Sequence, residues 1–204
     1  MVKQLSNIFL SASIPAIGEP FYDTTDVIAI RDSVKALATV VLPKAHLIWG
    51  GHPAITPLIR NVFLAINSEI NIKKHVTLYQ SEYFVEDFPK ENDTFEELII
   101  TPQVKVKNEK SFPKSLTKMR KQMISENEFK AAIFIGGKQG IIDEYRMFKK
   151  YHPTALVLPI ASTGGATKKI YDKIYNESET CNRRLLTDYA YMSLFKDYLK
   201  EYIE

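Results

Sequence analysis

The sequence is poor in the residues that bind metals or form disulfides. Its 204 residues include one cysteine, Cys181, and four scattered histidines. A single cysteine excludes an intramolecular disulfide and is typical of a protein from a reducing compartment. Because the histidines lack the spacing of metal ligands, we expect neither a metal site nor a cofactor.

Long apolar runs and an excess of one charge are also missing. No run approaches the roughly 18 residues of a membrane-spanning helix, and residues 1–7 lack the apolar core of a signal peptide. We therefore expect a cytoplasmic protein without a membrane partner. The 27 basic and 24 acidic residues leave a net charge of only +3. This balance disfavours nucleic acid as a partner, although small anionic ligands meet no general repulsion.

What the sequence does have is a regular alternation of apolar runs and amphipathic segments. The apolar runs predict strands at residues 7–13, 46–49, 75–79, 97–101, 131–135 and 155–160. The amphipathic segments predict helices at residues 25–42, 55–66, 115–124 and 141–148, and a C-terminal helix at about 186–203. Residues 80–92 predict an edge element or a loop over the sheet, and residues 102–112 a solvated loop. Such alternation is typical of an α/β protein, so we expect one domain, residues 1–204, with a Rossmann-like open, mainly parallel sheet and helices on both faces.

Residues 131–145 are the most informative part of the chain. Five apolar residues, typical of a strand buried on both faces, run directly into Gly136 and Gly137 before helical spacing resumes. A strand, a glycine turn and a helix N-terminus together form a phosphate cradle, because exposed N–H groups and the positive end of the helix dipole face one concavity. Glu144 falls in the first turn of the predicted helix. A tight turn without any ligand is the alternative interpretation.

Two further predicted strands end in turns of the same kind. Gly50 and Gly51 follow the second strand, residues 161–167 follow the last, and small hydroxyl residues end the first. The carboxyl ends of parallel strands share one edge of the sheet, where ligands bind in folds of this type. We therefore predict a ligand site formed by Ser11, Ser13, Gly50, Gly51, His52, Gly136, Gly137, Lys138, Gly140, Ser162, Thr163, Gly164 and Gly165.

Part of this pattern resembles the LOG family of cytokinin-riboside phosphohydrolases. In that family, and in the wider SLOG superfamily that joins LOG to DprA proteins, a helix with an arginine precedes an apolar strand. The strand ends in a glycine pair, which is followed by another glycine and a glutamate. Here Arg120 lies sixteen residues before Gly136, and Glu144 lies four residues after Gly140, as in LOG. The resemblance implies that Arg120 and Glu144 also belong to the ligand site.

The turn departs from the LOG sequence in three ways. Ile135 replaces a proline, the turn is one residue longer at Lys138 and Gln139, and Ile141 stands where LOG has a threonine. Taken together, the motifs span residues 7–170 and are most similar to the bacterial SLOG cluster families. Those families occur in nucleotide-signalling and anti-phage systems.

The resemblance implies two functions of different classes. The first is a sensor that binds a nucleotide or a nucleotide-derived signal, such as an ADP-ribose-type molecule. The second is an enzyme that cleaves the N-glycosidic bond of a nucleoside monophosphate. In that enzyme Arg120 holds the phosphoribosyl part, and Glu144 stabilises the developing oxocarbenium charge or positions a water. The longer turn favours the sensor, whereas the retained spacing favours the enzyme. A DprA-like binder of single-stranded DNA is disfavoured because the chain lacks a basic excess.

Several of these residues also have structural interpretations. Arg120 is typical of a solvent-facing charge on an amphipathic helix, and Glu144 of a carboxylate near a helix N-terminus. His52 and Thr163 suit capping roles as well as phosphate contacts. Three aromatic residues can stack on a base, although core packing is the favoured prediction for them: Tyr83, Phe84 and Phe88.

The partners follow from the same reasoning. LOG-like proteins are commonly dimers, and the tyrosine-rich segment at residues 186–203 carries more apolar surface than it needs to cover the edge of a sheet. We therefore expect a homodimer or a higher homo-oligomer. Its ligand is a nucleotide-derived small molecule, and a sensor of this kind works with a separate effector protein.

Overall fold

The computed structural model describes residues 5–105, 111–175 and 182–203 of the chain. Within these residues six strands form one sheet in the order β4-β3-β2-β1-β5-β6, and every neighbouring pair is parallel. The strands are β1 Asn7–Ser13, β2 His46–Gly50, β3 Val76–Ser81, β4 Leu98–Thr101, β5 Ala131–Gly136 and β6 Leu156–Ile160. The predicted open, mainly parallel sheet is confirmed. Because the strands are parallel, their carboxyl ends lie at one edge, where Ser13 is beside Gly136.

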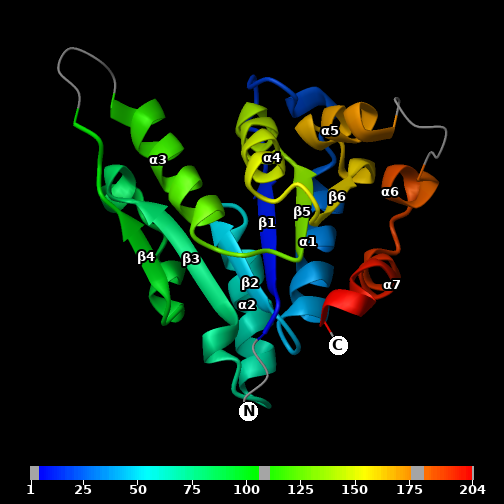
Figure 1. Ribbon diagram of the computed structural model, residues 1–204, viewed down its shortest axis with the longest axis horizontal. Coiled ribbons are helices and arrows are strands. Elements are labelled where there is room, and N and C mark those ends of the chain that lie inside the picture. Colours follow the sequence, from blue (N-terminus) through cyan, green and yellow to red (C-terminus); the bar gives the residue numbers. More distant parts are fainter. Residues whose placement is uncertain (1–4, 106–110, 176–181, 204) are drawn as a thin grey trace.

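Helices cover both faces of this sheet (Figure 1). They are α1 Val27–Val41, α2 Thr56–Asn67, α3 Ser111–Ser125, α4 Gln139–Tyr151, α5 Ala166–Tyr175, α6 Arg183–Thr187 and α7 Tyr191–Ile203. Side chains of α1, α2 and α7 pack on one face around Leu10 and Leu47, and those of α3 and α4 pack on the other around Phe9 and Phe134. The two faces alternate along each strand because successive side chains point to opposite sides. No helix of these residues is long and apolar enough to cross a membrane.

Several predicted boundaries shift. The segment after β3 forms two 3-10 helices, η3 Glu82–Asp87 and η4 Lys90–Thr94. Helix α3 begins at Ser111, within the predicted loop, and α4 begins at Gln139, two residues before the predicted start. Glu144 therefore lies in the second turn of α4 rather than the first. Residues 106–110 and Cys181 are outside the described residues.

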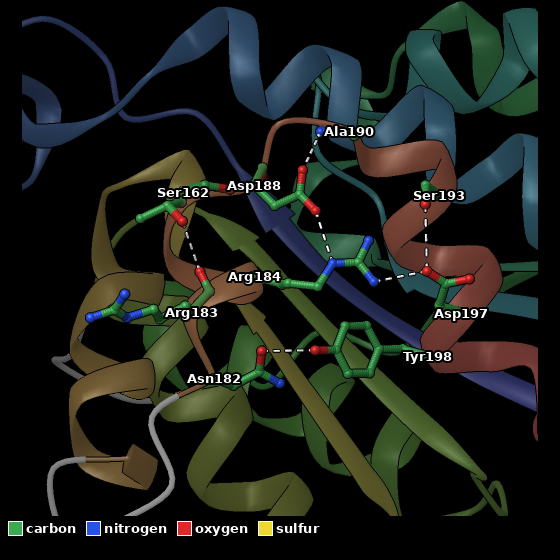
Figure 2. A network of polar contacts seen from close by, with 10 residues as sticks. Ser162, Asn182, Arg183, Arg184, Asp188, Ala190, Ser193, Asp197 and Tyr198 are labelled. Atoms are coloured by element: carbon green, nitrogen blue, oxygen red, sulfur yellow. Dashed lines mark hydrogen bonds and ion pairs between the residues drawn. The ribbon is translucent and has the colours of Figure 1, made fainter.

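The C-terminal segment forms two helices where one is predicted. Asp188 lies between α6 and α7 with an extended backbone, and its carboxylate accepts hydrogen bonds from the N–H of Ala190 (2.8 Å) and from Nε of Arg184 (3.0 Å). Arg184 also donates to Asp197 on α7, at 2.8 Å (Figure 2). Aspartate side chains compete with helical backbone bonds in this way. The carboxylate of Asp188 thus ends one helix and precedes the next.

Helix α7 buries its apolar side chains within the same chain. Leu194, Phe195 and Leu199 are fully buried, and α7 packs on α1. Tyr189 (61% exposed) and Met192 (39% exposed) are the large apolar groups left at the surface of this segment. The apolar surface that α7 offers to another subunit is therefore smaller than the sequence indicates. Self-association stays a prediction.

Candidate functional site

A cavity of about 610 Å³ lies at the carboxyl ends of β1 and β2. The chain runs outward from β1 to β4 on one side of the sheet and then places β5 and β6 on the other side, so the strand order reverses beside β1. At such a reversal the loops of an open parallel sheet diverge and leave a crevice for ligands. The walls come from the end of β1, the turn after β2, the η3 segment, α3 and the start of α4.

The cavity brings together most of the predicted ligand residues. Those that line it are Ser11, Ser13, Gly50, Gly51, His52, Arg120, Lys138, Gly140 and Glu144. They come from four segments that are far apart in the sequence, and they meet because β1 lies between β2 and β5 in the sheet. Two of the three glycine turns therefore contribute to one site.

One part of the cavity presents donors that have no partner among the described residues. Ser11 (2% exposed) and Ser13 (8% exposed) lie on one side of β1, and the hydroxyl of neither bonds to those residues. Lys138 precedes α4 with an extended backbone, and its side chain does not cap the helix. The N–H groups of Gln139 and Gly140 likewise have no acceptor in the described chain. Hydroxyl and N–H groups at the positive end of a helix dipole form an anion-binding arrangement.

An ion pair between Arg120 and Glu144 forms the cavity wall between α3 and α4. Arg120 Nε lies 2.8 Å from Glu144 Oε1, and the two side chains are 16% and 13% exposed. Gly140 makes room for this pair, since a Cβ at that position would lie 2.3 Å from Arg120 Nη2. Residues four apart share one face of a helix. The guanidinium of Arg120 therefore lies against Gly140 and bonds to Glu144. This contact explains why four residues separate the glycine from the glutamate in the sequence.

A second ion pair joins Lys138 to Glu19, which lies in the loop after β1. The hydrogen bond from Lys138 holds the pKa of the Glu19 carboxyl below its usual range. His52 is close to both groups, and burial, followed by the charge of Lys138, lowers its pKa to about 4. His52 is thus neutral at pH 7. Its Nδ1 accepts from the N–H of Ala54 at 3.2 Å, so Nε2 carries the proton and can donate to a ligand.

The part of the cavity beside β3 is aromatic and apolar. Phe84 in η3 and Phe88 directly after it line this part, together with Phe112, Leu116 and Met119 from α3. The rings of Phe84 and Phe112 lie 5.6 Å apart in an edge-to-face arrangement. This packing holds Phe84 in place at the cavity wall.

The prediction of core packing for the aromatic residues after β3 is wrong. Tyr83 is 39% exposed, and Phe84 and Phe88 are half-buried outside both apolar clusters of the protein. The η3 segment lies beyond the carboxyl end of β3, so its rings pack over the edge of the sheet rather than on its face. Their position at the cavity keeps base stacking as a prediction for Phe84 and Phe88.

The six remaining predicted residues do not line the cavity: Gly136, Gly137, Ser162, Thr163, Gly164 and Gly165. Thr163 is fully buried, and its hydroxyl accepts from the N–H of Gly136 (2.8 Å) and donates to the carbonyl of Ile160 (2.6 Å). A Cβ at Gly165 would lie 2.8 Å from the carbonyl oxygen of Gly137. The turn after β6 thus packs directly against the turn after β5, and protein occupies the space that a ligand would need there.

The cavity also contains residues that the sequence analysis does not select. Glu19, Gln80 and Asp87 line it, as do the apolar residues of α3. Gln80 could have been selected from the sequence, because it is a polar residue directly after the predicted strand 75–79 and therefore at the ligand-binding edge. No local pattern in the sequence identifies Glu19, since its pairing with Lys138 depends on the path of a long loop. Among the described residues no cluster of histidine, cysteine or carboxylate side chains is suited to a metal ion.

Comparison with known proteins agrees with this architecture. Curated proteins give no match. Eleven chains of solved structures match, among them the X-ray structure of TM1055, a structural genomics target. The similarity covers 89% of each chain with a TM-score of 0.53 at 14% sequence identity, which supports the shared fold alone. The model of the SLOG cluster3 family matches residues 20–199. The chain belongs to the SLOG cluster3 family.

Proposed function

We propose that the protein binds a nucleotide or a nucleotide-derived small molecule in the cavity and acts as a sensor in a bacterial defence or signalling system. The observation that carries the proposal is the division of one cavity into a donor-lined part and an aromatic part. Unpartnered hydroxyl and N–H groups suit a phosphate, and the rings of Phe84 and Phe88 suit a base. Membership of a SLOG family supports a nucleotide-related ligand.

The charges of the cavity restrict how much phosphate it holds. Its cations, Arg120 and Lys138, are each paired with a carboxylate, and further carboxylates line the wall. A triphosphate would meet this negative charge without a free cation among the described residues. We therefore propose a ligand whose phosphate is bound mainly by neutral donors, with Lys138 exchanging Glu19 for the phosphate. Nucleoside monophosphates and ADP-ribose-type molecules fit this description better than triphosphates do.

Calorimetry with AMP, ATP, ADP-ribose and ribose 5-phosphate tests the proposal. The chain offers a matched pair of variants, because Ser11 and Ser33 both have buried hydroxyls without a partner, but only Ser11 lines the cavity. Ser11→Ala is expected to weaken binding of the phosphate-bearing ligand about tenfold through loss of one hydrogen bond to a charged group. Ser33→Ala leaves binding unchanged. Equal effects of the two variants, or no binding of any of these ligands, would contradict the proposal.

A second function is favoured by one specific observation. Arg120 and Glu144 lie 2.8 Å apart and face the same cavity, as hydrolysis of a nucleoside monophosphate requires. In that reaction Arg120 holds the phosphoribosyl group, and Glu144 faces the sugar and stabilises the positive charge that develops on it. The ion pair itself argues for the sensor, because a carboxylate already bonded to a guanidinium has less negative charge to offer the sugar.

Release of free base from the common nucleoside monophosphates, followed by chromatography, separates the two functions. For a hydrolase, Glu144→Gln abolishes turnover but keeps nucleotide binding, since the amide keeps the shape and loses the charge. Asp143→Asn is the matched control, because Asp143 also lines the cavity next to Glu144 but bonds to Gln139 and Arg146. We expect no base release from the wild type. Robust release that depends on Glu144 and not on Asp143 would reverse this assignment.

A further inference from the structure

Gln80 is a buried polar residue whose side-chain amide has no hydrogen-bond partner among the described residues. It is 5% exposed, near the carboxyl end of β3, and it lines the cavity. Its backbone carbonyl accepts from the Thr101 hydroxyl at 3.3 Å, but its side-chain amide bonds to none of the described residues. The amide atoms of Gln80 are not among the fully enclosed polar atoms that lack a partner, so the amide is open to the cavity although the residue as a whole is buried. An amide in such a position bonds to water or to a ligand. An amide facing a cavity in this state is suited to a ligand.

The neighbours of Gln80 hold the amide against the cavity wall. A Cβ at Gly51 would lie 2.0 Å from Gln80 Nε2 and 2.8 Å from its Cδ. The amide therefore occupies the space that a side chain at position 51 would fill. Gly51 is itself held to β3 by a hydrogen bond from its N–H to the carbonyl of Tyr79, at 3.0 Å. Gly51, which the sequence analysis predicts as a ligand-binding residue, thus also makes room for the amide of Gln80.

The amide lies in the part of the cavity beside β3 that also contains Phe84 and Phe88. Aromatic rings bind the faces of a base, and a glutamine amide binds its edge, because it presents one acceptor beside two donors. The cations of the described cavity wall, Arg120 and Lys138, belong to the part near α4. Among the described residues, a base bound beside β3 would therefore meet an amide at its edge, whereas the guanidinium and the ammonium lie in the other part of the cavity.

We infer that Gln80 selects the base of the bound nucleotide and that this base is adenine. The inference rests on the proposed nucleotide-binding function. Glutamine pairs in two places with adenine, accepting from the N6 amino group and donating to N7, whereas guanine, with two adjacent acceptors, is read by arginine or lysine. Phe84 and Phe88 provide the apolar surface on which the purine stacks. Gln80 is thus a specificity-determining residue, distinct from the phosphate-binding donors of β1 and α4.

Binding of AMP, IMP, GMP, UMP and ribose 5-phosphate, measured by calorimetry, tests this inference. IMP replaces the amino group of adenine with an acceptor oxygen, and ribose 5-phosphate lacks the base. The wild type is expected to bind AMP at least tenfold more tightly than IMP, in line with the discrimination that a two-point pair gives. Gln80→Met keeps the length of the side chain and removes the amide. It is expected to weaken AMP binding roughly tenfold to a hundredfold and to remove the preference over IMP.

Two further variants distinguish a specific loss of base selection from a general loss of structure. Gly51→Ala displaces the amide without removing it, and it is expected to lower the preference for AMP in the same direction as Gln80→Met. Gln122→Met makes the same chemical change on α3 outside the cavity wall, and it is expected to leave the preference unchanged. Thermal unfolding of each variant confirms that the chain is folded.

The outcomes separate this inference from the function on which it rests. If AMP and IMP weaken equally in Gln80→Met, or neither changes, Gln80 does not select the base, although the nucleotide site stands. A wild type that prefers IMP, GMP or UMP to AMP overturns the assignment to adenine. If none of the nucleotides and not even ribose 5-phosphate binds, both the proposed function and the role of Gln80 are wrong.

Discussion

The turn that follows β5 and the turn that follows β6 have similar sequences and different surroundings. After β6, the N–H groups of Gly164, Gly165 and Ala166 bond to the carbonyls of Ala161, Thr24 and Gly137, respectively. After β5, the N–H groups of Gln139 and Gly140 bond to none of the described residues and face the cavity. The difference shows that glycines alone do not indicate a ligand site. A glycine turn becomes a ligand site where its backbone donors have no protein partner.

The largest expected effect is a loss of stability on replacing a glycine in the turn after β6, which the same change in the turn after β5 does not cause. Gly164 has φ +69° and ψ −154°, a conformation that essentially only glycine adopts, and a Cβ there would lie 1.9 Å from the Thr24 carbonyl oxygen. Gly164→Ala is therefore expected to lower the free energy of unfolding by about 3 kcal/mol or more. Urea unfolding measures this change.

Gly140→Ala is the matched change in the turn that faces the cavity. Its Cβ would meet only the guanidinium end of the Arg120 side chain and no backbone atom, and alanine is the better helix former. The free energy of unfolding is therefore expected to change by less than about 1 kcal/mol, whereas ligand affinity falls because the guanidinium is displaced. A similar loss of stability in both variants would show that the two turns do not differ as described.

The second prediction concerns pH and the His52 side chain of the cavity. Burial lowers the pKa of His52 in the folded protein to about 4, compared with its ordinary value of 6.5. Between these values the unfolded chain binds more protons than the folded chain, so stability falls as the pH drops from 6.5 to 4. The largest loss that this group can contribute is about 3 kcal/mol.

Unfolding measured in urea from pH 7 to pH 4 tests this prediction on the wild type and on His52→Gln. The glutamine does not titrate, so the stability of that variant is expected to depend less on pH over this range. Parallel curves for the two proteins would show that the pKa of His52 is not lowered in the folded protein. The turn after β6 has no titratable side chain between Ile160 and Ala166, and it adds nothing to this dependence.

The sequence predicts the fold well because apolar periodicity and strand length are local properties. All six strands and their shared edge follow from runs such as residues 131–135. The break at Asp188 escapes prediction because the apolar spacing continues through it. What marks the break is Arg184 of α6, which donates to Asp188 between the helices and to Asp197 on α7.

The candidate site is predicted only where its signal is a motif with fixed spacing. Gly140 and Glu144 lie one helical turn apart on α4. The side chain of Arg120 reaches both of them from α3. The pairing of Glu19 with Lys138 spans 119 residues and leaves no local trace. The neighbours that occupy the turn after β6 also come from distant segments, so the sequence could not show that protein fills it.

The smallest predicted effect tests the reason why the turn after β6 is closed. The buried Thr163 hydroxyl accepts from the N–H of Gly136 and donates to the carbonyl of Ile160, at 2.8 and 2.6 Å. Thr163→Val keeps the shape but leaves that N–H unsatisfied, and it is expected to cost about 2 kcal/mol of unfolding free energy. Thr39→Val removes an exposed hydroxyl that donates to the Lys35 carbonyl within α1, and it should change stability by less than about 0.5 kcal/mol. If Thr163→Val were as harmless as Thr39→Val, the hydroxyl would not hold the two turns together.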